Sequence, residues 1–304
     1  MGVDWQKTLK SAISCVGVGL HRGTRVDMTL LPAEPDTGIV FRRADLGGTE
    51  VRATHENVNG TLMCTSISNG DGAKVATVEH LMAALSGLEI DNLIVELDGD
   101  EVPIMDGSAA PFVFLIECAG IAEQHVPRRA IRILKTIEVA DDGRSVSLSP
   151  ADGFSIAFEI DFDHPLIGGQ SCYFDLSDGV FKRELSRART FGFLAEIDRL
   201  HENGLALGGS LENAVVLSDD AVVNEGGLRY ADEFVRHMAL DCIGDLYLAG
   251  APLIGHVHGV RSGHKMNHRL LEALFADDDA WCSVVLDDIT GSRRARPATI
   301  AATA

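Results

Sequence analysis

The chain has 304 residues, 46% of them apolar, so it is long enough to bury one large core or two cores of about 150 residues each. Asp and Glu number 45 against 26 Lys and Arg, which gives a formal charge of −19. A surface this acidic repels phosphate backbones, so we expect no nucleic acid partner, and an anionic small substrate would need a local basic pocket.

The N-terminus does not have the pattern of a secretory signal. It carries charges at Asp4, Lys7 and Lys10 and has no apolar run before a small-residue cleavage site. No stretch approaches the roughly 18 uninterrupted apolar residues that cross a bilayer. The six cysteines form no C-x-x-C pair, which argues against a disulfide framework and a thiolate zinc site. We expect a cytoplasmic protein with reduced thiols and no transmembrane segment, and the absence of heptads favours a monomer.

In the first half of the chain, the hydropathy pattern predicts strands followed by helices. Residues 9–31 alternate apolar and polar side chains around glycines, which is typical of paired strands with tight turns. Residues 77–87 begin with a capping threonine and end with glycine, which predicts a helix. Residues 92–97 have the pattern of a strand. Residues 108–119 predict a second helix, with Pro111 in its first turn.

A polar segment at residues 123–129 is the clearest break in the middle of the chain, and a new series of strands follows it. We therefore predict a domain boundary there. The N-terminal domain would span residues 1–126 and the C-terminal domain residues 127–304. The order of strands and then helices recurs in the two halves, which favours two structurally similar α+β domains.

The second half begins with alternating segments that predict antiparallel strands at residues 131–138, 145–148 and 154–162. Residues 232–249 follow as the clearest helix of this half, because apolar and acidic side chains recur at helical spacing. The final residues, 291–304, lack periodicity and are expected to form a mobile tail.

Three polar residues of the predicted helix 232–249 could bind a cation. His237 and Asp241 are four residues apart, so both side chains emerge on one face. A pair at this spacing is also a common hydrogen bond on a helix surface. Asp245 follows one turn later, however, and three aligned polar groups on an apolar helix would cost several kcal/mol if they were buried without partners.

Glu79 and His80 stand side by side in the first turn of the predicted helix 77–87. Adjacent helical residues point about 100° apart, so one metal ligand with a neighbouring general base fits this pair better than two ligands do. In the alternative, Glu79 only complements the helix dipole and His80 is incidental. Other histidines offer rival sites, because spacing does not choose among His80, His237, His256, His258, His264 and His268.

A series of motifs, in one order over nearly the whole chain, then points to a known family. The motifs are GVGLHRG at 17–23, TVEHL at 77–81, IMDGSAAPF at 104–112, HP at 164–165, ARTFGF at 188–193, NEGGLRY at 224–230, EFVRH at 233–237, IGDLY at 243–247 and SGH at 262–264. In these motifs the chain closely resembles the bacterial UDP-3-O-acyl-N-acetylglucosamine deacetylases, the LpxC family.

The resemblance implies an α+β fold of two similar domains, each with helices packed on a mainly antiparallel sheet, and an active site in the cleft between them. It implies zinc-dependent hydrolysis of the N-acetyl group of UDP-3-O-(3-hydroxyacyl)-N-acetylglucosamine, which releases acetate in the committed step of lipid A biosynthesis. The metal ligands would be His80, His237 and Asp241, and they leave a fourth position for water. Fe²⁺ is an alternative ion, because imidazole and carboxylate accept either metal.

The resemblance also implies the catalytic groups. Glu79 would be the general base and His264 the general acid, with Asp245 as the partner that orients His264. Thr190 would donate its hydroxyl near the oxyanion.

Four further positions would bind substrate or lie close to it. Phe191 and the region 164–205 would line an apolar passage for the acyl chain, although Phe191 is equally suited to an ordinary core. Cys64, in LMCT at 62–65, matches a block near the metal, whereas composition alone favours a buried thiol. His21 matches a position near the site, and a structural hydrogen bond within its turn is the alternative.

One position departs from the family pattern. The family usually has lysine directly after the metal-binding histidine, whereas this chain has Met238. That lysine is expected to help hold the anionic diphosphate. Arg261 keeps a basic residue just before the SGH motif, and it is the fourth substrate-binding candidate. We therefore expect weaker or differently arranged diphosphate binding.

Overall fold

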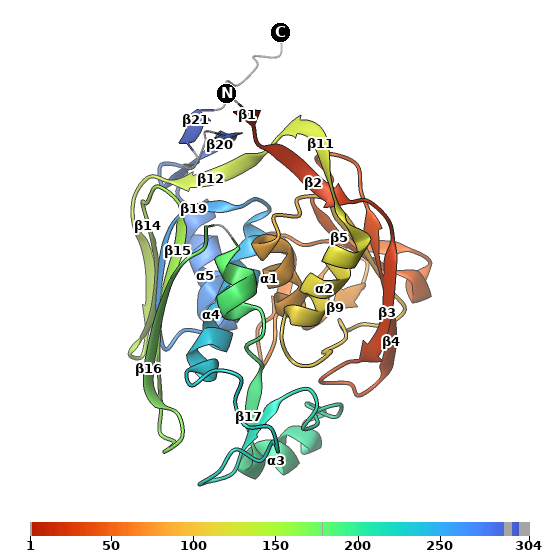
Figure 1. Cartoon of the computed structure of the whole chain (residues 1–304), viewed down its shortest axis with the longest axis vertical. Helices are drawn as coiled ribbons and strands as arrows, with labels where there is room; N and C mark the ends of the chain where they lie inside the picture. Colours follow the sequence, from red (N-terminus) through yellow and green to blue (C-terminus); the bar gives the residue numbers. More distant parts are fainter. Residues whose placement is uncertain (1, 178, 289–293, 298–304) are drawn as a thin grey trace.

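Alternating burial along the first strands builds one of two large sheets. In β4, for example, Val26, Met28 and Leu30 are buried while their neighbours face outward. The computed structural model describes residues 2–177, 179–288 and 294–297, and in it two sheets enclose the main helices between them (Figure 1). The first sheet has the order β3 (Ile13–Val18), β4 (Arg25–Pro32), β10 (Leu93–Leu97), β5 (Ile39–Arg43) and β6 (Thr49–Arg52).

The second sheet has nine strands over the described part of the chain. In both large sheets most neighbours are antiparallel, with parallel pairs between β10 and β5 and between β19 and each of β12 and β15. The strands of the second sheet are β1 (Gly2–Val3), β12 (Arg129–Ile133), β13 (Ile137–Asp141), β14 (Arg144–Ser149), β15 (Phe154–Phe162), β16 (Gly168–Asp175), β19 (Leu253–Val260), β20 (Trp281–Asp288) and β21 (Arg294–Pro297).

Smaller elements connect the sheets. The paired short strands are β2 (Trp5–Leu9) with β11 (Ile121–Pro127), β7 (Val58–Gly60) with β8 (Ser66–Ser68) and β9 (Lys74–Val75), and β17 (Phe191–Phe193) with β18 (Val215–Leu217). The short helical turns are η1 (Ala44–Leu46), η2 (His55–Asn57), the π-helical η3 (Phe181–Leu185), η4 (Leu194–Glu196), η5 (Tyr247–Ala249) and the helix α3 (Ile197–Glu202). The longer helices are α1 (Glu79–Gly87), α2 (Ala110–Ala119), α4 (Glu233–Leu246) and α5 (His264–Phe275).

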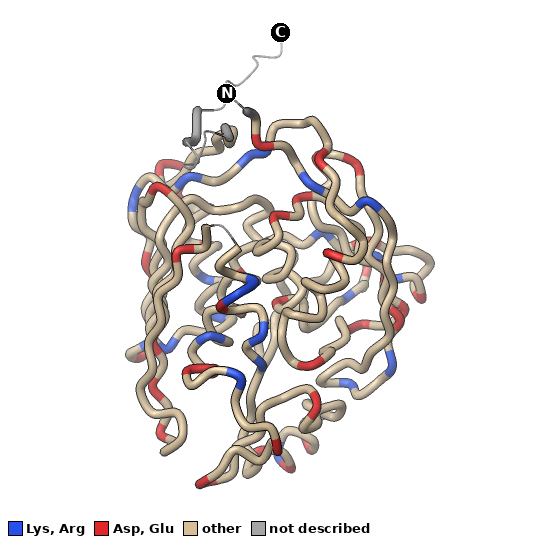
Figure 2. The backbone as a smooth tube through the Cα atoms, viewed as in Figure 1, with Lys and Arg blue, Asp and Glu red and all other residues tan. Residues whose placement is uncertain are grey.

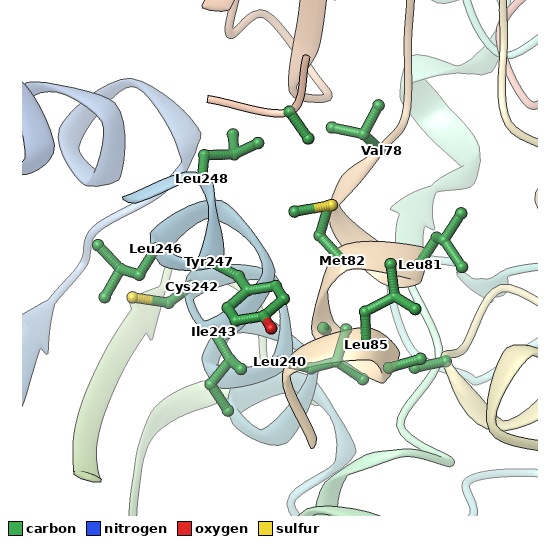
Figure 3. Close-up of a cluster of buried hydrophobic side chains, with 14 of the residues drawn as sticks. Val78, Leu81, Met82, Leu85, Leu240, Cys242, Ile243, Leu246, Tyr247 and Leu248 are labelled. Carbon is green, nitrogen blue, oxygen red and sulfur yellow. The ribbon is translucent and has the colours of Figure 1, made fainter. Parts of the chain in front are cut away.

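The helices α1 and α4 pack against each other in the middle of the molecule. Figure 3 shows Met82 and Leu85 of α1 facing Leu240, Ile243 and Tyr247 of α4 and η5. All five side chains are buried. Burying an aliphatic side chain of this size contributes about 1.5–3 kcal/mol, so this contact strongly favours one arrangement of the two helices.

The predicted α+β class and the mainly antiparallel sheets are confirmed, as are the strands at 92–97 and within 9–31. The expected helix 232–249 is also present, as α4 continued by η5. The division into domains at 1–126 and 127–304 stays a prediction.

Three details of the expected elements are wrong. Thr77 does not cap α1: its φ is 58°, and its hydroxyl donates to Glu101 instead. The polar segment 123–129 is not an irregular linker, because most of it forms β11, which pairs with β2. The expected strand 131–138 is divided between β12 and β13.

The expected mobile tail, residues 291–304, lies mostly outside the described residues, and Arg294–Pro297 form β21. Among the described residues, none of the helices has the length and apolar character that a bilayer crossing requires. All six cysteines are free thiols.

Candidate metal and catalytic site

Three buried donor side chains meet where α1 packs on α4. His80 comes from the first turn of α1, and His237 and Asp241 lie one turn apart on α4. Nε2 of His80 is 3.3 Å from Oδ1 of Asp241, and Nε2 of His237 is 3.3 Å from Oδ2. Each of the three residues offers one donor atom within 4.8 Å of the other two. The helical spacing therefore does bring His237 and Asp241 to one point, and α1 adds the third donor.

The contacts of these side chains fit a divalent metal. Nδ1–H of His237 donates to the carbonyl of Ala188 at 3.1 Å, which leaves Nε2 with a free lone pair. Burial lowers the pKa of His237 to about 4, so this imidazole is neutral, as a ligand must be. Among the described residues, buried Oδ1 of Asp241 makes no hydrogen bond, because its 3.3 Å contact with Nε2 of His80 lacks the geometry of one. Such an atom costs free energy unless a cation or donor satisfies it, and two imidazoles with one carboxylate form a typical catalytic zinc set.

Gly244 allows the two helices to approach closely enough for this arrangement. A Cβ at this position would lie 2.0 Å from the carbonyl oxygen of Glu79 and 3.1 Å from the nitrogen of Ala83. No larger side chain fits without moving one helix. The glycine thus sets the distance between His80 on α1 and Asp241 on α4.

Two more titratable side chains, those of Glu79 and His264, lie close to the donor cluster and to each other. Oε2 of Glu79 accepts the backbone N–H of Thr65 at 3.1 Å, and Oε1 lies 3.8 Å from Nε2 of His264. His264 begins α5, and its Nδ1 is 2.8 Å from Oδ2 of Asp245. Asp245 also accepts a hydrogen bond from Asn267. The carboxylate of Glu79 and the imidazole of His264 therefore lie next to each other, with Oε1 and Nε2 directed to the same point beside the donor cluster.

Burial and nearby charges shift the pKa values of Glu79 and His264, and the shifts suit one group to accept a proton and the other to donate one. Burial raises the pKa of Glu79 to about 7, so its carboxylate can accept a proton near neutral pH. Burial disfavours the charged form of His264, but the charge of Asp245 and its hydrogen bond outweigh this effect and raise the pKa of His264 to about 10. The imidazole is therefore protonated at neutral pH and can donate from Nε2.

The segment from η3 to β17 borders the cluster from another side. Its Ala188 carbonyl contacts His237, and the N–H of Thr190 donates to the carbonyl of Gly107 at 2.8 Å. The ring of Phe191 lies 6.4 Å from the ring of His237 and 5.0 Å from that of Phe234, centroid to centroid. Thr190 and Phe191 thus belong to the segment that contacts His237, and the roles expected for them stay predictions.

Phe191 belongs to an aromatic group that includes Phe162, Phe193 and His164. Ring centroids are 5.6 Å apart for Phe191 and Phe162, and 5.3 Å apart for His164 and Phe193. Phe162, Phe191 and Phe193 are each only partly buried. These partly buried rings form an apolar group that continues from His237 toward β15.

The remaining candidate residues have varied surroundings. Cys64 is buried, and burial raises the pKa of its thiol to about 12, so it stays protonated. His21 is buried, and its Nδ1 accepts the N–H of Ala206 at 3.4 Å. Arg261 is exposed, with a φ of 53°. Met238 is partly buried against the core.

The rival histidines have other partners. His256 hydrogen-bonds Ser155, and His258 contacts Glu159. His268 lies 3.5 Å from Glu272 on α5. Within the described residues, the group of donors that could share an ion contains none of these three histidines.

Several basic residues lie close together in one stretch of this acidic protein. Figure 2 shows both basic and acidic residues spread over the molecule, and basic residues follow one another along η3 and the segment after it. This stretch contains Lys182, Arg183, Arg187 and Arg189. Arg189 is held by Glu233 at 2.8 Å. The local excess of basic residues lies in the same segment as Ala188, which contacts His237.

Comparison with known proteins shows the family of the chain. A family model described as UDP-3-O-acyl N-acetylglycosamine deacetylase (LpxC) matches residues 6–276. The chain belongs to this family. The chain is 54% identical over 288 residues to the UDP-3-O-acyl-N-acetylglucosamine deacetylase of Chromohalobacter salexigens, covering 94% of this chain and 95% of that protein. It is 54% identical over 286 residues to the protein of the same name in Pseudomonas entomophila, covering 93% of this chain and 94% of that protein.

In this LpxC family member, sequence reasoning missed several residues that hold the site together. Thr65 and Asn267 hydrogen-bond Asp245, Gly244 sets the helix contact, and Glu233 holds Arg189 beside Thr190. Gly244 had one available signal, since a glycine inside a helical pattern usually has a packing reason. Thr65 stands in the LMCT block that the resemblance placed near the metal, but nothing there indicated a contact with Asp245. Asn267 had no signal, because nothing in a single sequence distinguishes it from other polar residues.

Proposed function

We propose that this chain catalyses hydrolysis of the N-acetyl group of UDP-3-O-(3-hydroxyacyl)-N-acetylglucosamine, releasing acetate and a free amine in the committed step of lipid A biosynthesis. One observation carries the proposal. In a member of the LpxC family, a set of donors that could hold a metal lies beside a buried carboxylate and an imidazole that is paired with Asp245. Hydrolysis of an amide requires these functions together, because its amine leaves poorly unless it is protonated.

His80, His237 and Asp241 would hold the metal, which we propose to be zinc, with Fe²⁺ as the alternative. When bound there, the ion would act as a Lewis acid toward the acetyl carbonyl and increase the acidity of water. The donors come from two helices that are fixed by core packing, so they are positioned before the ion arrives.

Glu79 would act as the general base. Its raised pKa, about 7, leaves much of it ionised at neutral pH, yet basic enough to take a proton from the attacking water. The backbone N–H of Thr65 holds Oε2, so Oε1 is left to face the reacting atoms. As water attacks the carbonyl carbon, its proton passes to Glu79 and the hydroxyl of Thr190 stabilises the oxyanion.

His264 would act as the general acid. Asp245 holds Nδ1, so the proton on Nε2 is directed to the side of the imidazole where Oε1 of Glu79 lies. The carbon–nitrogen bond then breaks as His264 transfers this proton to the amine nitrogen. Asp245 keeps the imidazole protonated and oriented until that step.

The substrate's other parts would contact the remaining candidates. Phe191 and the aromatic group beside it would bind the acyl chain, where each buried CH₂ contributes about 0.8 kcal/mol. Arg261 would approach the diphosphate, and Cys64 and His21 would shape the wall of the site. We further propose a cytoplasmic monomer with domains at residues 1–126 and 127–304, which gel filtration and limited proteolysis can test.

The test is acetate release from UDP-3-O-(3-hydroxyacyl)-N-acetylglucosamine by zinc-loaded protein. Glu79→Gln is the matched control, because glutamine keeps an oxygen that accepts the Thr65 N–H but cannot accept the proton. We expect turnover in the wild type that is lost in Glu79→Gln, lost again after chelation, and restored by Zn²⁺. A folded, metal-bound wild type without turnover would show that the substrate class is wrong.

A further inference from the structure

Thr65 contacts both helices that carry the site, α1 and α4. It directly precedes β8 and is 2% exposed. Its backbone N–H donates to Glu79, and its carbonyl accepts the N–H of Val78, the residue before α1. Its hydroxyl donates to Oδ1 of Asp245 at 2.6 Å, across 180 positions of the sequence. One buried residue therefore contacts the start of α1 through its main chain and α4 through its side chain.

We propose that Thr65 is a positioning residue for the deacetylation, acting through Asp245 on His264. The proposal rests on the function proposed above. Its hydroxyl fixes the carboxylate of Asp245, which in turn fixes the direction in which Nε2 of His264 points.

The hydrogen bonds of Asp245 show why the hydroxyl matters. Oδ2 accepts from His264 at 2.8 Å and from Asn267 at 2.9 Å. In the described part of the chain, the hydrogen bond to Oδ1 comes from Thr65. Donors on both oxygens hold the carboxylate plane in one orientation. Without the hydroxyl, the carboxylate can turn about its Cβ–Cγ bond, and Nδ1 of His264 loses its fixed partner.

The main-chain contacts of Thr65 make the experiment selective. Substitution of the side chain leaves the bonds to Glu79 and Val78 intact, so the start of α1 and its ligand His80 stay in place. A loss of activity would then come from the hydroxyl alone and not from a displaced metal ligand.

The experiment compares Thr65→Val, which removes the hydroxyl at nearly constant volume, with Thr65→Ser, which keeps it. Thr8→Val is the structural control. Thr8 is also buried, and its hydroxyl donates to the carbonyl of Asn92 and accepts the N–H of Ala33, but it lies on β2. All variants are loaded with Zn²⁺ and compared for metal content, melting temperature, kcat and KM in acetate release. Thr65→Ala is the second hydroxyl-free variant if Thr65→Val does not fold.

We expect Thr65→Val to lower kcat by about 10- to 100-fold with KM and metal content unchanged, as removal of a group that orients another typically does. Thr65→Ser should recover most of the rate. Thr8→Val should lower the melting temperature and leave kcat unchanged. The proposal is overturned if Thr65→Val retains the wild-type kcat, or if Thr65→Ser is as slow as Thr65→Val.

Histidine NMR gives a second readout that does not depend on turnover. The Nδ1 proton of His264, hydrogen-bonded to Asp245, should shift or broaden in Thr65→Val and stay unchanged in Thr8→Val. An unchanged signal in Thr65→Val would contradict the proposal. If the wild type releases no acetate, the proposed function fails, while the NMR comparison still decides whether Thr65 positions His264.

Discussion

Replacing Gly244 by alanine tests whether the contact between α1 and α4 sets the geometry of the site. The new Cβ would lie 2.0 Å from the carbonyl oxygen of Glu79 and 2.8 Å from its carbonyl carbon. Both atoms are backbone, so no side chain can rotate away. Relief requires the helices to move apart by roughly 1 Å, since non-bonded heavy atoms repel strongly at this distance.

Two effects of opposite sign decide the change in stability. Alanine in place of glycine inside a helix normally stabilises by about 1 kcal/mol. Overpacking of a close contact costs about 1–3 kcal/mol, and we expect the upper value here because the clash is with backbone. The net loss is therefore about 2 kcal/mol, which lowers Tm by roughly 4 °C in a chain of this size.

The activity should fall more steeply than the stability. A shift of about 1 Å in reacting groups can reduce the rate about 100-fold, and this shift moves Glu79 and His80 relative to Asp241. The assay is kcat/KM for acetate release, with metal content and Tm measured on the same samples.

Gly153→Ala is the matched control, because a Cβ at Gly153 meets no atom within 4 Å and its φ is not in the left-handed region. It should change neither Tm nor rate. A Gly244→Ala variant with wild-type kcat/KM and an equal or higher Tm would refute the role of this helix contact.

Three other changes test charge effects. Asp245→Asn should move the alkaline limb of the pH profile of kcat to lower pH. Burial lowers the pKa of His264, but the charge of Asp245 and its hydrogen bond raise it to about 10, so without this charge the imidazole loses its proton at lower pH. An alkaline limb that does not move would contradict this assignment. Glu233→Gln should lower the free energy of unfolding at pH 7. Burial opposes ionisation of Glu233, but hydrogen bonds from Arg189 and from backbone N–H groups lower its pKa in the folded state. Urea titrations should therefore give a higher free energy of unfolding for the wild type than for the variant above about pH 4.3. This difference should disappear as the pH falls through the pKa of Glu233 in the folded state. Met238→Lys should lower KM for the UDP-linked substrate and make it more salt-dependent, and an unchanged KM at low salt would argue against diphosphate binding there.

Several features followed from local sequence patterns alone. The helix α4 was predictable because apolar and acidic side chains recur at helical spacing. The helix α1 was predictable because a run of helix formers ends at Gly87, and strand β10 because apolar residues occupy a short run. The pairing of His237 with Asp241 followed from the same spacing, since residues four apart on a helix share a face. These statements concern one element at a time, for which the backbone geometry is known in advance.

Local patterns were misleading where a distant partner changes the preference of a segment. Residues 123–129 appeared to be a linker because they are polar, but β2 supplies the hydrogen bonds that make most of them strand β11. Thr77 has the composition of a helix cap, yet Glu101 takes its hydroxyl and the backbone turns to a φ of 58°. In both cases the deciding contact lies more than 20 positions away.

The sequence by itself determined the α+β class, the main helices and a set of histidines and acids able to bind a metal or move a proton. Resemblance to a family then favoured particular members of that set. Only the tertiary structure brought His80 to His237 and Asp241, because this depends on how closely α1 approaches α4 at Gly244. The contact between Thr65 and Asp245 likewise exists only in the folded chain, since it joins residues 180 positions apart. Spacing determines which side chains share a face within one element, whereas packing determines which faces meet.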